Sequence, residues 1–312
     1  MNTKLSINNI VDWTTAEDMV HNVKVDEVGV LDRVSSLATR SIKKESKLNA
    51  LQKIVSMCDL TTLEGEDTEG KIIQMSSKAI APDPNDESVP SAAAVCVYPA
   101  LVSTAKKTVK DSSVKVASVS SYFPSGQAPI ESKISDTKFA INEGADEIDI
   151  VINRKAFFEG NYKKVYEEIK SLKDVCGDIH LKTILEIGEL KTYENIKKAS
   201  VIALCAGSDF IKTSTGKISN GSSREACLVM ARTVREFQSY GHGMRGIKVA
   251  GGIRSSKDAI RYLVIVNEEL GSSWLSPDYF RFGASSLLDD VLRQIKKLKT
   301  NAYQSSYYFP RG

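Results

Sequence analysis

Eight short apolar runs alternate with helix-forming segments along most of the chain, and this alternation restricts the fold more than any other feature. The runs are short, rich in β-branched residues and not strictly alternating, which is typical of parallel strands buried on both faces. They are IVSMCDL (54–60), AAAVCVY (92–98), VKVASVS (114–120), EIDIVIN (147–153), LKTILEI (181–187), DFIKTS (209–214), GIKVAGGI (246–253) and YFRFGA (279–284).

Amphipathic helices are predicted between these runs. In residues 162–175, Val165, Ile169 and Leu172 recur at helical spacing, and residues 285–299 carry a longer stripe of the same kind. Ser255, with an acidic residue three positions later, is a helix-start signal similar to a capping box.

Eight strand-and-helix repeats predict a TIM (β/α)8 barrel over residues 51–300. A doubly wound sheet is the main alternative, but no GxGxxG motif follows the first run. Residues 1–50 are expected to form an N-terminal helical extension, residues 81–90 a proline-rich loop, and residues 301–312 a flexible C-terminal tail.

Composition limits the classes of partner. The net charge of the 312 residues is +3, without a long basic run, which argues against binding of nucleic acid or a membrane surface. No apolar segment reaches the length of a signal peptide or a membrane span. Five scattered cysteines favour a reducing, cytoplasmic location, and three isolated histidines disfavour a metal centre.

Among the charged residues inside the apolar runs, three stand out: Asp149, Lys212 and Lys248. In a TIM barrel the catalytic groups lie at the carboxyl ends of the strands, and consecutive strands would bring the two lysines together. A lysine reaching the rim or a buried salt bridge explains any one of them alone. The three together favour a catalytic group.

Such a group suits imine chemistry. An ordinary lysine is neutral in only about one molecule in 2,500 at pH 7, and only the neutral amine attacks a carbonyl. Burial and a second ammonium nearby both lower a lysine pKa. Lys212 beside Lys248 is therefore a candidate Schiff-base nucleophile, with Asp149 placed for proton transfer.

Glycines and hydroxyl residues gather at the ends of the last three predicted strands: STGK (214–217) follows the sixth, AGG (250–252) follows the seventh, and GASS (283–286) ends the eighth at a helix start. Late loops of TIM barrels and a helix N-terminus often bind phosphate through backbone N–H groups. The residues thus predict an imine-forming enzyme for a small phosphorylated carbonyl compound.

Several blocks of the chain resemble the deoxyribose-phosphate aldolase family, in the order found there, over about residues 50–300, and their spelling resembles its longer, eukaryotic-type branch. The blocks are DLTTL (59–63), AAVCVYPALV (93–102), GADEIDIVIN (144–153), LKTILEIGEL (181–190), GSDFIKTSTGK (207–217), IKVAGGIRSSKDA (247–259) and FRFGASSLL (280–288). Val249 stands where the family usually has proline.

The resemblance implies reversible cleavage of 2-deoxy-D-ribose 5-phosphate to D-glyceraldehyde 3-phosphate and acetaldehyde, in deoxyribose and deoxynucleoside catabolism, with no metal or cofactor. It places the Schiff base on Lys212, the second lysine at Lys248 and the proton relay at Asp149. Substrate-binding positions fall on Asp59, Cys96, Lys182, Thr215, Gly216, Lys217, Gly251, Gly252, Gly283, Ser285 and Ser286.

Alternatives stay open at this level. Another class I aldolase or a transaldolase would use the same lysine chemistry, and a non-catalytic barrel could act as a binding or scaffold protein. A homo-oligomer, dimer or tetramer, is compatible with the resemblance. The tail tyrosines Tyr303, Tyr307 and Tyr308 are candidates for reaching the site, and the sequence does not choose among them.

Overall fold

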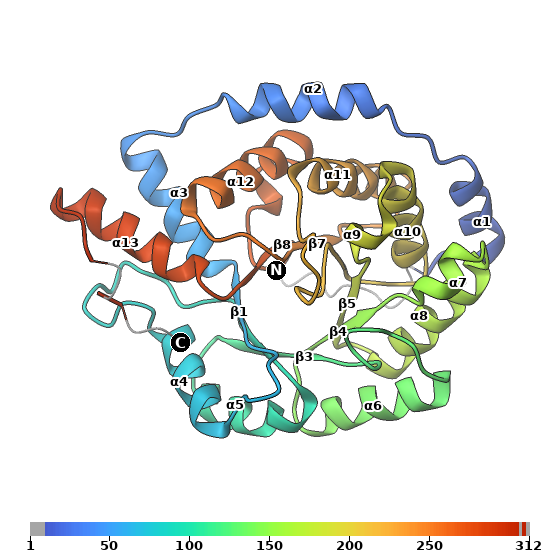
Figure 1. The fold of residues 1–312 in the computed structure, drawn as a ribbon, viewed down its shortest axis with the longest axis horizontal. Coiled ribbons are helices and arrows are strands. Elements are labelled where there is room, and N and C mark those ends of the chain that lie inside the picture. Colours follow the sequence, from blue (N-terminus) through green and yellow to red (C-terminus); the bar gives the residue numbers. More distant parts are fainter. Residues whose placement is uncertain (1–9, 306–307, 310–312) are drawn as a thin grey trace.

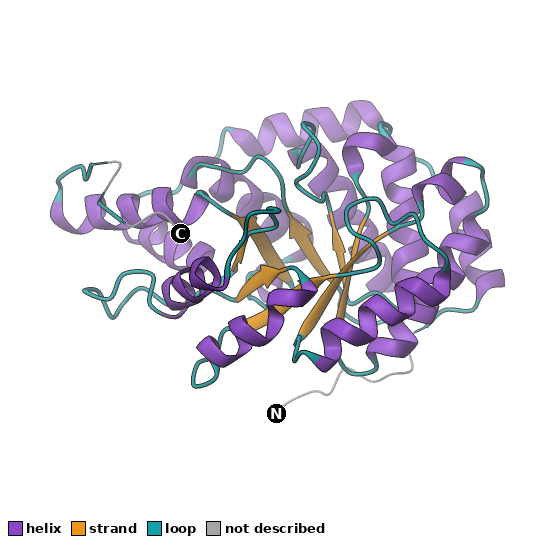
Figure 2. Cartoon of the chain, turned by 60° about the horizontal axis from the view of Figure 1, so that its bottom comes forward, coloured by secondary structure: helices purple, strands orange, loops and turns teal. Residues whose placement is uncertain are grey.

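The computed structural model describes residues 10–305 and 308–309, and it forms a closed barrel of eight parallel strands (Figures 1 and 2). The strands pair in chain order, and β1 pairs with β8 to close the ring. They are β1 (Cys58–Thr61), β2 (Ala94–Val97), β3 (Lys115–Val119), β4 (Glu147–Val151), β5 (His180–Ile184), β6 (Phe210–Lys212), β7 (Gly246–Val249) and β8 (Phe280–Ala284). The predicted TIM barrel is confirmed.

Helices surround the strands, as the ring of purple ribbons in Figure 2 shows. Those that follow β1 to β8 are α4 (Glu69–Ile80), α5 (Val102–Val109), α6 (Ile130–Asn142), α7 (Arg154–Phe158), α8 (Tyr162–Cys176), α9 (Ile187–Leu190), α10 (Tyr193–Cys205), α11 (Arg224–Ser239), α12 (Ser256–Leu270) and α13 (Leu287–Thr300). Two 3-10 turns, η1 (Pro99–Leu101) and η2 (Ser272–Trp274), complete the barrel segment.

The local signals of the sequence are found where they were expected. Val165, Ile169 and Leu172 form the buried face of α8, and the Ser255 side chain accepts a hydrogen bond from Asp258 N at the start of α12. Residues 81–90 form the predicted loop. The first apolar run is divided, because α3 (Lys44–Ser56) ends within it and β1 begins at Cys58. Periodicity alone does not separate a short buried helix segment from a strand.

The N-terminal extension lies along the outside of the barrel. Its first helices, α1 (Trp13–His21) and α2 (Glu27–Ala38), run beside α8, α10, α11 and α12 (Figure 1). Tyr166 of α8 donates a hydrogen bond of 2.7 Å to the Val11 carbonyl, and Arg33 of α2 pairs with Glu269 of α12 at 2.9 Å. These contacts attach the extension to helices that follow β4 and β7. Among the described residues, none of the helices has the length and apolar character needed to cross a membrane.

Burial of one face of α2 predicts how the extension contributes to stability. Leu37 is 3% exposed and Leu31, on the same helix, is 52% exposed. Leu37→Ala should lower the free energy of unfolding by about 2–5 kcal/mol, since it leaves a cavity. Leu31→Ala is the matched control and should change it by under about 0.5 kcal/mol. Denaturant titration measures both, and equal effects would mean that α2 is not packed on the barrel.

Candidate active site

The strand register brings the charged residues of the apolar runs into one part of the barrel. Lys212 of β6 is the direct partner of Lys248 on β7, and Lys248 is the direct partner of Arg281 on β8. On the two strands that precede β6, Asp149 of β4 pairs in register with Lys182 of β5, and β5 pairs with β6. All five side chains are buried. The predicted proximity of the two lysines is confirmed.

Asp149 is the centre of this group. Its Oδ2 atom lies 2.7 Å from the Lys212 Nζ and 3.0 Å from the Lys248 Nζ, while its Oδ1 atom lies 2.9 Å from the Lys182 Nζ. Burial would raise the pKa of Asp149, but the three ammonium groups hold it well below the ordinary value. The carboxylate is therefore ionised and shared by three amines.

Two further carboxylates complete the buried network. Asp59 of β1 pairs with Lys248 at 2.6 Å and with Arg281 at 2.7 Å. Glu147 of β4 pairs with Lys182 at 2.6 Å and with Arg281 at 2.9 Å. Arg281 thus joins Asp59 to Glu147 across the interior of the barrel.

The charges in this network do not balance when every group is ionised. Among the described residues it holds four cations, Lys182, Lys212, Lys248 and Arg281, and three carboxylates, Asp59, Glu147 and Asp149. An uncompensated buried charge is costly, so one cation is under pressure to lose its proton.

Lys212 is the cation that the geometry selects. Lys182, Lys248 and Arg281 each pair with two carboxylates, whereas Lys212 pairs with Asp149 alone among the described residues. Burial and the Lys248 ammonium lower the pKa of Lys212. Burial also opposes the charged form of Lys248, but Asp149 and Asp59 outweigh it and raise the pKa of Lys248. The arrangement therefore favours a neutral amine at Lys212.

A cavity of about 220 Å³ opens next to this amine, at the carboxyl ends of the late strands. Its charged lining consists of Lys212, Lys217, Arg254 and Glu64, and Glu64 pairs with Lys217 at 2.9 Å. With Lys212 neutral, two cations, Lys217 and Arg254, face one carboxylate, Glu64, so the cavity carries a net positive charge suited to a phosphate. The predicted residues that line it are Lys212, Thr215, Gly216, Lys217, Gly251, Gly252, Gly283 and Ser285.

Gly283 has a role that its position in a turn-like motif did not suggest. It lies within β8, as the eighth run predicted, and a Cβ atom there would stand 2.7 Å from Ala250 Cβ and 3.6 Å from Lys248 Cε. The missing side chain therefore leaves room for Ala250 in the loop after β7, while Lys248 Cε would lie at ordinary contact distance. Thr213 Oγ1 accepts from Ala250 N at 2.9 Å and donates to Ala250 O at 3.0 Å, which joins the loops after β6 and β7.

The other predicted positions lie outside the lining of the cavity. Asp59 and Lys182 belong to the buried network beneath it, and Cys96 packs with Leu63 and Val119 beside it. Ser286 precedes the first residue of α13 and does not line the cavity.

Neither described tail tyrosine reaches the cavity. Tyr303 is exposed and lies under the Lys297 ammonium, 3.7 Å from the ring centroid. Tyr308 packs edge-on against Phe309, with ring centroids 5.0 Å apart. Tyr307 lies outside the described residues.

Three buried charged residues near the site were not predicted, although each lies within a segment quoted above. Arg281 is a charge inside an apolar run, which is the criterion that selected Lys212. Glu147 is the first acid of the block that contains Asp149. Glu186 is the penultimate residue of the fifth run and is fully buried. Attention to every charge in an apolar run, instead of the three most prominent, would have found all of them.

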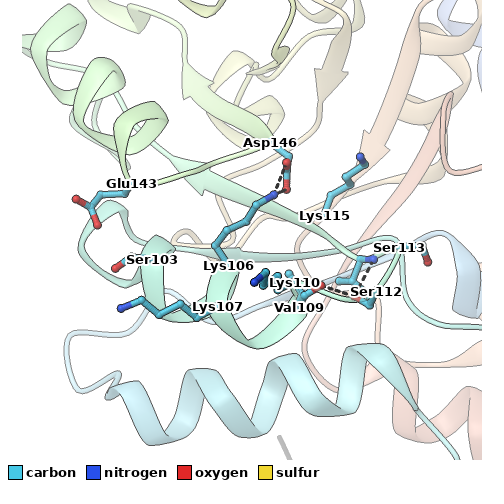
Figure 3. Close-up of a pocket in the computed structure, with 11 residues that line it drawn as sticks. Ser103, Lys106, Lys107, Val109, Lys110, Ser112, Ser113, Lys115, Glu143 and Asp146 are labelled. Atoms are coloured by element: carbon cyan, nitrogen blue, oxygen red, sulfur yellow. Dashed lines mark hydrogen bonds and ion pairs between the residues drawn. The ribbon is translucent and has the colours of Figure 1, made fainter.

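Volume alone does not identify the site. A cavity of about 370 Å³ lies at the amino ends of β3 and β4, where Lys106 of α5 pairs with Asp146 at 2.6 Å (Figure 3). Its other lysines, among them Lys107 and Lys115, point in different directions in Figure 3. This cavity holds no member of the buried network. In the described part of the chain, no three His, Cys, Asp or Glu side chains form a group that could hold a metal ion.

A closed (β/α)8 barrel, with a buried amine of lowered pKa beside a positive cavity, is equipped to act as an imine-forming carbon–carbon lyase. Comparison with known proteins places the chain in that class. A family model described as "DeoC/LacD family aldolase" matches residues 53–293, and the chain belongs to this family. The resemblance found in the sequence is confirmed, and the protein is an aldolase.

Individual relatives agree with the family. Deoxyribose-phosphate aldolase from Homo sapiens is 42% identical over 303 residues, covering 93% of this chain and 95% of the human protein. The Mus musculus enzyme of the same name is also 42% identical, over the same shares. A solved structure of a putative deoxyribose-phosphate aldolase from Coccidioides immitis is 25% identical, with a TM-score of 0.67, covering 86% of this chain and 99% of that one.

The charge count gives a prediction for Lys212. Arg281→Met removes one cation, which leaves three cations against three carboxylates with Lys212 charged, so the pKa of Lys212 should rise. The measurement is the rate at which a small aldehyde and cyanoborohydride alkylate Lys212, with the product located by peptide mass spectrometry. The midpoint of the pH profile of this rate should lie at higher pH than in the wild type.

Arg281→Lys keeps the charge and is the matched control, with a midpoint near that of the wild type. An unchanged midpoint in Arg281→Met, in protein with the circular dichroism of the wild type, would contradict the charge argument.

Proposed function

We propose that this aldolase cleaves 2-deoxy-D-ribose 5-phosphate reversibly to D-glyceraldehyde 3-phosphate and acetaldehyde, through a Schiff base on Lys212. The observation that carries the proposal is the position of Lys212, whose amine contacts Asp149 at 2.7 Å and also lines the positive cavity. One residue thus joins a proton-transfer group to a site for an anion. The names of the human and mouse relatives support the choice of substrate.

The first step forms the imine. The neutral Lys212 amine attacks the C1 aldehyde of the open-chain sugar phosphate and gives a carbinolamine, which loses water to become an iminium ion. Asp149 contacts the nitrogen of Lys212, so it is placed to accept the proton that the attacking amine loses and to return it to the departing hydroxide.

Carbon–carbon cleavage follows. The C3 hydroxyl gives up its proton, the electrons of the C2–C3 bond move toward the iminium, and D-glyceraldehyde 3-phosphate leaves. The remaining two-carbon enamine takes a proton at C2 and becomes an iminium again, and water then releases acetaldehyde and the free amine.

Lys248 and Asp149 form the proton relay for these steps. Lys248 lies 3.0 Å from the same Asp149 oxygen that contacts Lys212, so a proton accepted at one amine changes the charge felt at the other. The raised pKa of Lys248 keeps it charged beside the neutral nucleophile. Its positive charge therefore favours the neutral form of Lys212 before attack.

The cavity binds the phosphate at the far end of the substrate. Gly216, Gly251 and Gly252 bring backbone close to the space, and Lys217 and Arg254 supply positive charge. Binding energy from this remote group orients the aldehyde at Lys212. A homo-oligomer stays a prediction.

Borohydride trapping tests the reaction type and the nucleophile together. Sodium borohydride added with 2-deoxy-D-ribose 5-phosphate should reduce the iminium and leave a covalent adduct on Lys212, located by peptide mapping. Lys212→Ala should abolish the adduct and lower turnover by a factor of roughly a thousand or more, since the covalent route is lost.

Lys106→Ala, at the opposite end of the barrel, is the control and should keep the adduct. Activity should persist after treatment with EDTA. An adduct found on Lys248 alone would contradict the assignment of the nucleophile, and loss of activity with EDTA would contradict a metal-independent mechanism.

A further inference from the structure

Glu186 stands at the carboxyl end of β5 in an unusual setting for a carboxylate. It is fully buried, and its backbone is in the left-handed region, with φ of 58° and ψ of 62°. Hydrogen bonds between neighbouring backbone groups hold this conformation: Leu185 N donates to Lys212 O at 2.9 Å, and Ile187 N donates to Thr213 O at 3.0 Å. A non-glycine residue in this conformation costs about 1–3 kcal/mol and persists where the surroundings enforce it.

Both carboxylate oxygens of Glu186 accept hydrogen bonds from one residue, Thr215. Thr215 N donates to Oε1 at 3.3 Å, and the Thr215 hydroxyl donates to Oε2 at 2.5 Å. Because the carboxylate only accepts, the hydroxyl proton points to Glu186 and a lone pair is left for another donor. Lys217 N supplies that donor, at 3.0 Å. The three residues form a continuous chain of hydrogen bonds.

This series of hydrogen bonds ends in the turn that lines the cavity. Gly216, between Thr215 and Lys217, has a φ of 79°, which a residue with a side chain rarely adopts. Lys217 and Gly216 line the cavity, whereas Glu186 does not. A carboxylate that touched the phosphate directly would repel it. Glu186 therefore acts on the turn through its contacts with Thr215, from outside the lining of the cavity.

The charge of Glu186 is compensated from the side away from the cavity. Arg154 of α7 lies 3.7 Å from Glu186 Oε2 and 3.0 Å from Glu189 Oε2. The same guanidinium donates to the carbonyls of Pro124 and Ser125, which fixes its position. The Glu186 carboxylate therefore has a cationic neighbour that does not line the cavity.

We propose that Glu186 is a positioning residue for phosphate binding: it fixes Thr215, and Thr215 fixes the Gly216–Lys217 turn in the shape that binds the phosphate of the substrate. This rests on the proposed function, because it assigns the phosphate to that turn. Loss of Glu186 should therefore weaken binding of phosphate and leave the amine of Lys212 competent.

Glu186→Gln tests the proposal with almost no change in volume. The amide of glutamine has one acceptor oxygen, so it satisfies only one of the two donors of Thr215. KM for 2-deoxy-D-ribose 5-phosphate, and the dissociation constant of inorganic phosphate measured by calorimetry, should each rise roughly tenfold or more. The rate of Lys212 alkylation by acetaldehyde and cyanoborohydride, which uses no phosphate, should stay within about twofold of the wild type.

Two further variants control the result. Glu189→Gln removes the other carboxylate on Arg154, is 43% exposed at its side chain and does not touch Thr215, so it should leave all three measurements unchanged. Thr215→Val removes the hydroxyl and keeps the buried charge, so it should reproduce the loss of phosphate binding and serves if Glu186→Gln does not fold. The double variant should bind phosphate no more weakly than the single variant with the weaker binding, because both substitutions interrupt the same series of hydrogen bonds.

Equal losses in phosphate binding and in alkylation of Lys212 would overturn the proposal, as would unchanged phosphate binding in both Glu186→Gln and Thr215→Val. A wild type that binds no inorganic phosphate would overturn it as well. A wild type that binds phosphate but does not cleave 2-deoxy-D-ribose 5-phosphate would instead contradict the proposed function, while the calorimetry still tests Glu186.

Discussion

Three carboxylates buried among four cations at the centre of the barrel are the constraint on which the rest of the site depends. Each ionised group without a partner there would cost several kcal/mol, so the strands must hold every charge against an opposite one. Strand pairing sets the cations Lys212, Lys248 and Arg281 side by side on consecutive strands. The carboxylates of β1 and β4 meet them from across the interior of the barrel. The one cation left in excess is the one that can be neutral.

This imbalance connects the interior of the barrel to the chemistry of its rim. Lys212 is the last residue of β6, so its amine belongs to the buried network and also lines the cavity above it. The glycine turns that follow β6 and β7 bring backbone close to that space. Glu186 and Thr215 then hold one of these turns, so the residues that set the charge and those that shape the cavity are separate groups on the same strand ends.

The fold and the main members of the site were predictable from the sequence for one physical reason. Residues buried on both sides are apolar, so a charge among them is conspicuous, and Lys212, Lys248 and Asp149 were found in this way. Arg281 satisfies the same criterion and was not predicted. The first strand was placed too early because Ile54 and Val55, both buried, belong to the end of α3.

The sequence by itself determined that eight buried strands alternate with helices, that lysines and an aspartate stand within them, and that glycines lie at the ends of the last three. These are local properties, set by the period of the apolar residues and by glycine. Only the tertiary structure decided which amine is left with a single carboxylate, that Glu186 contacts Thr215, and that Gly283 leaves room for Ala250. Those facts depend on the register and closure of the barrel, which join residues far apart in the chain and leave no trace in local spacing.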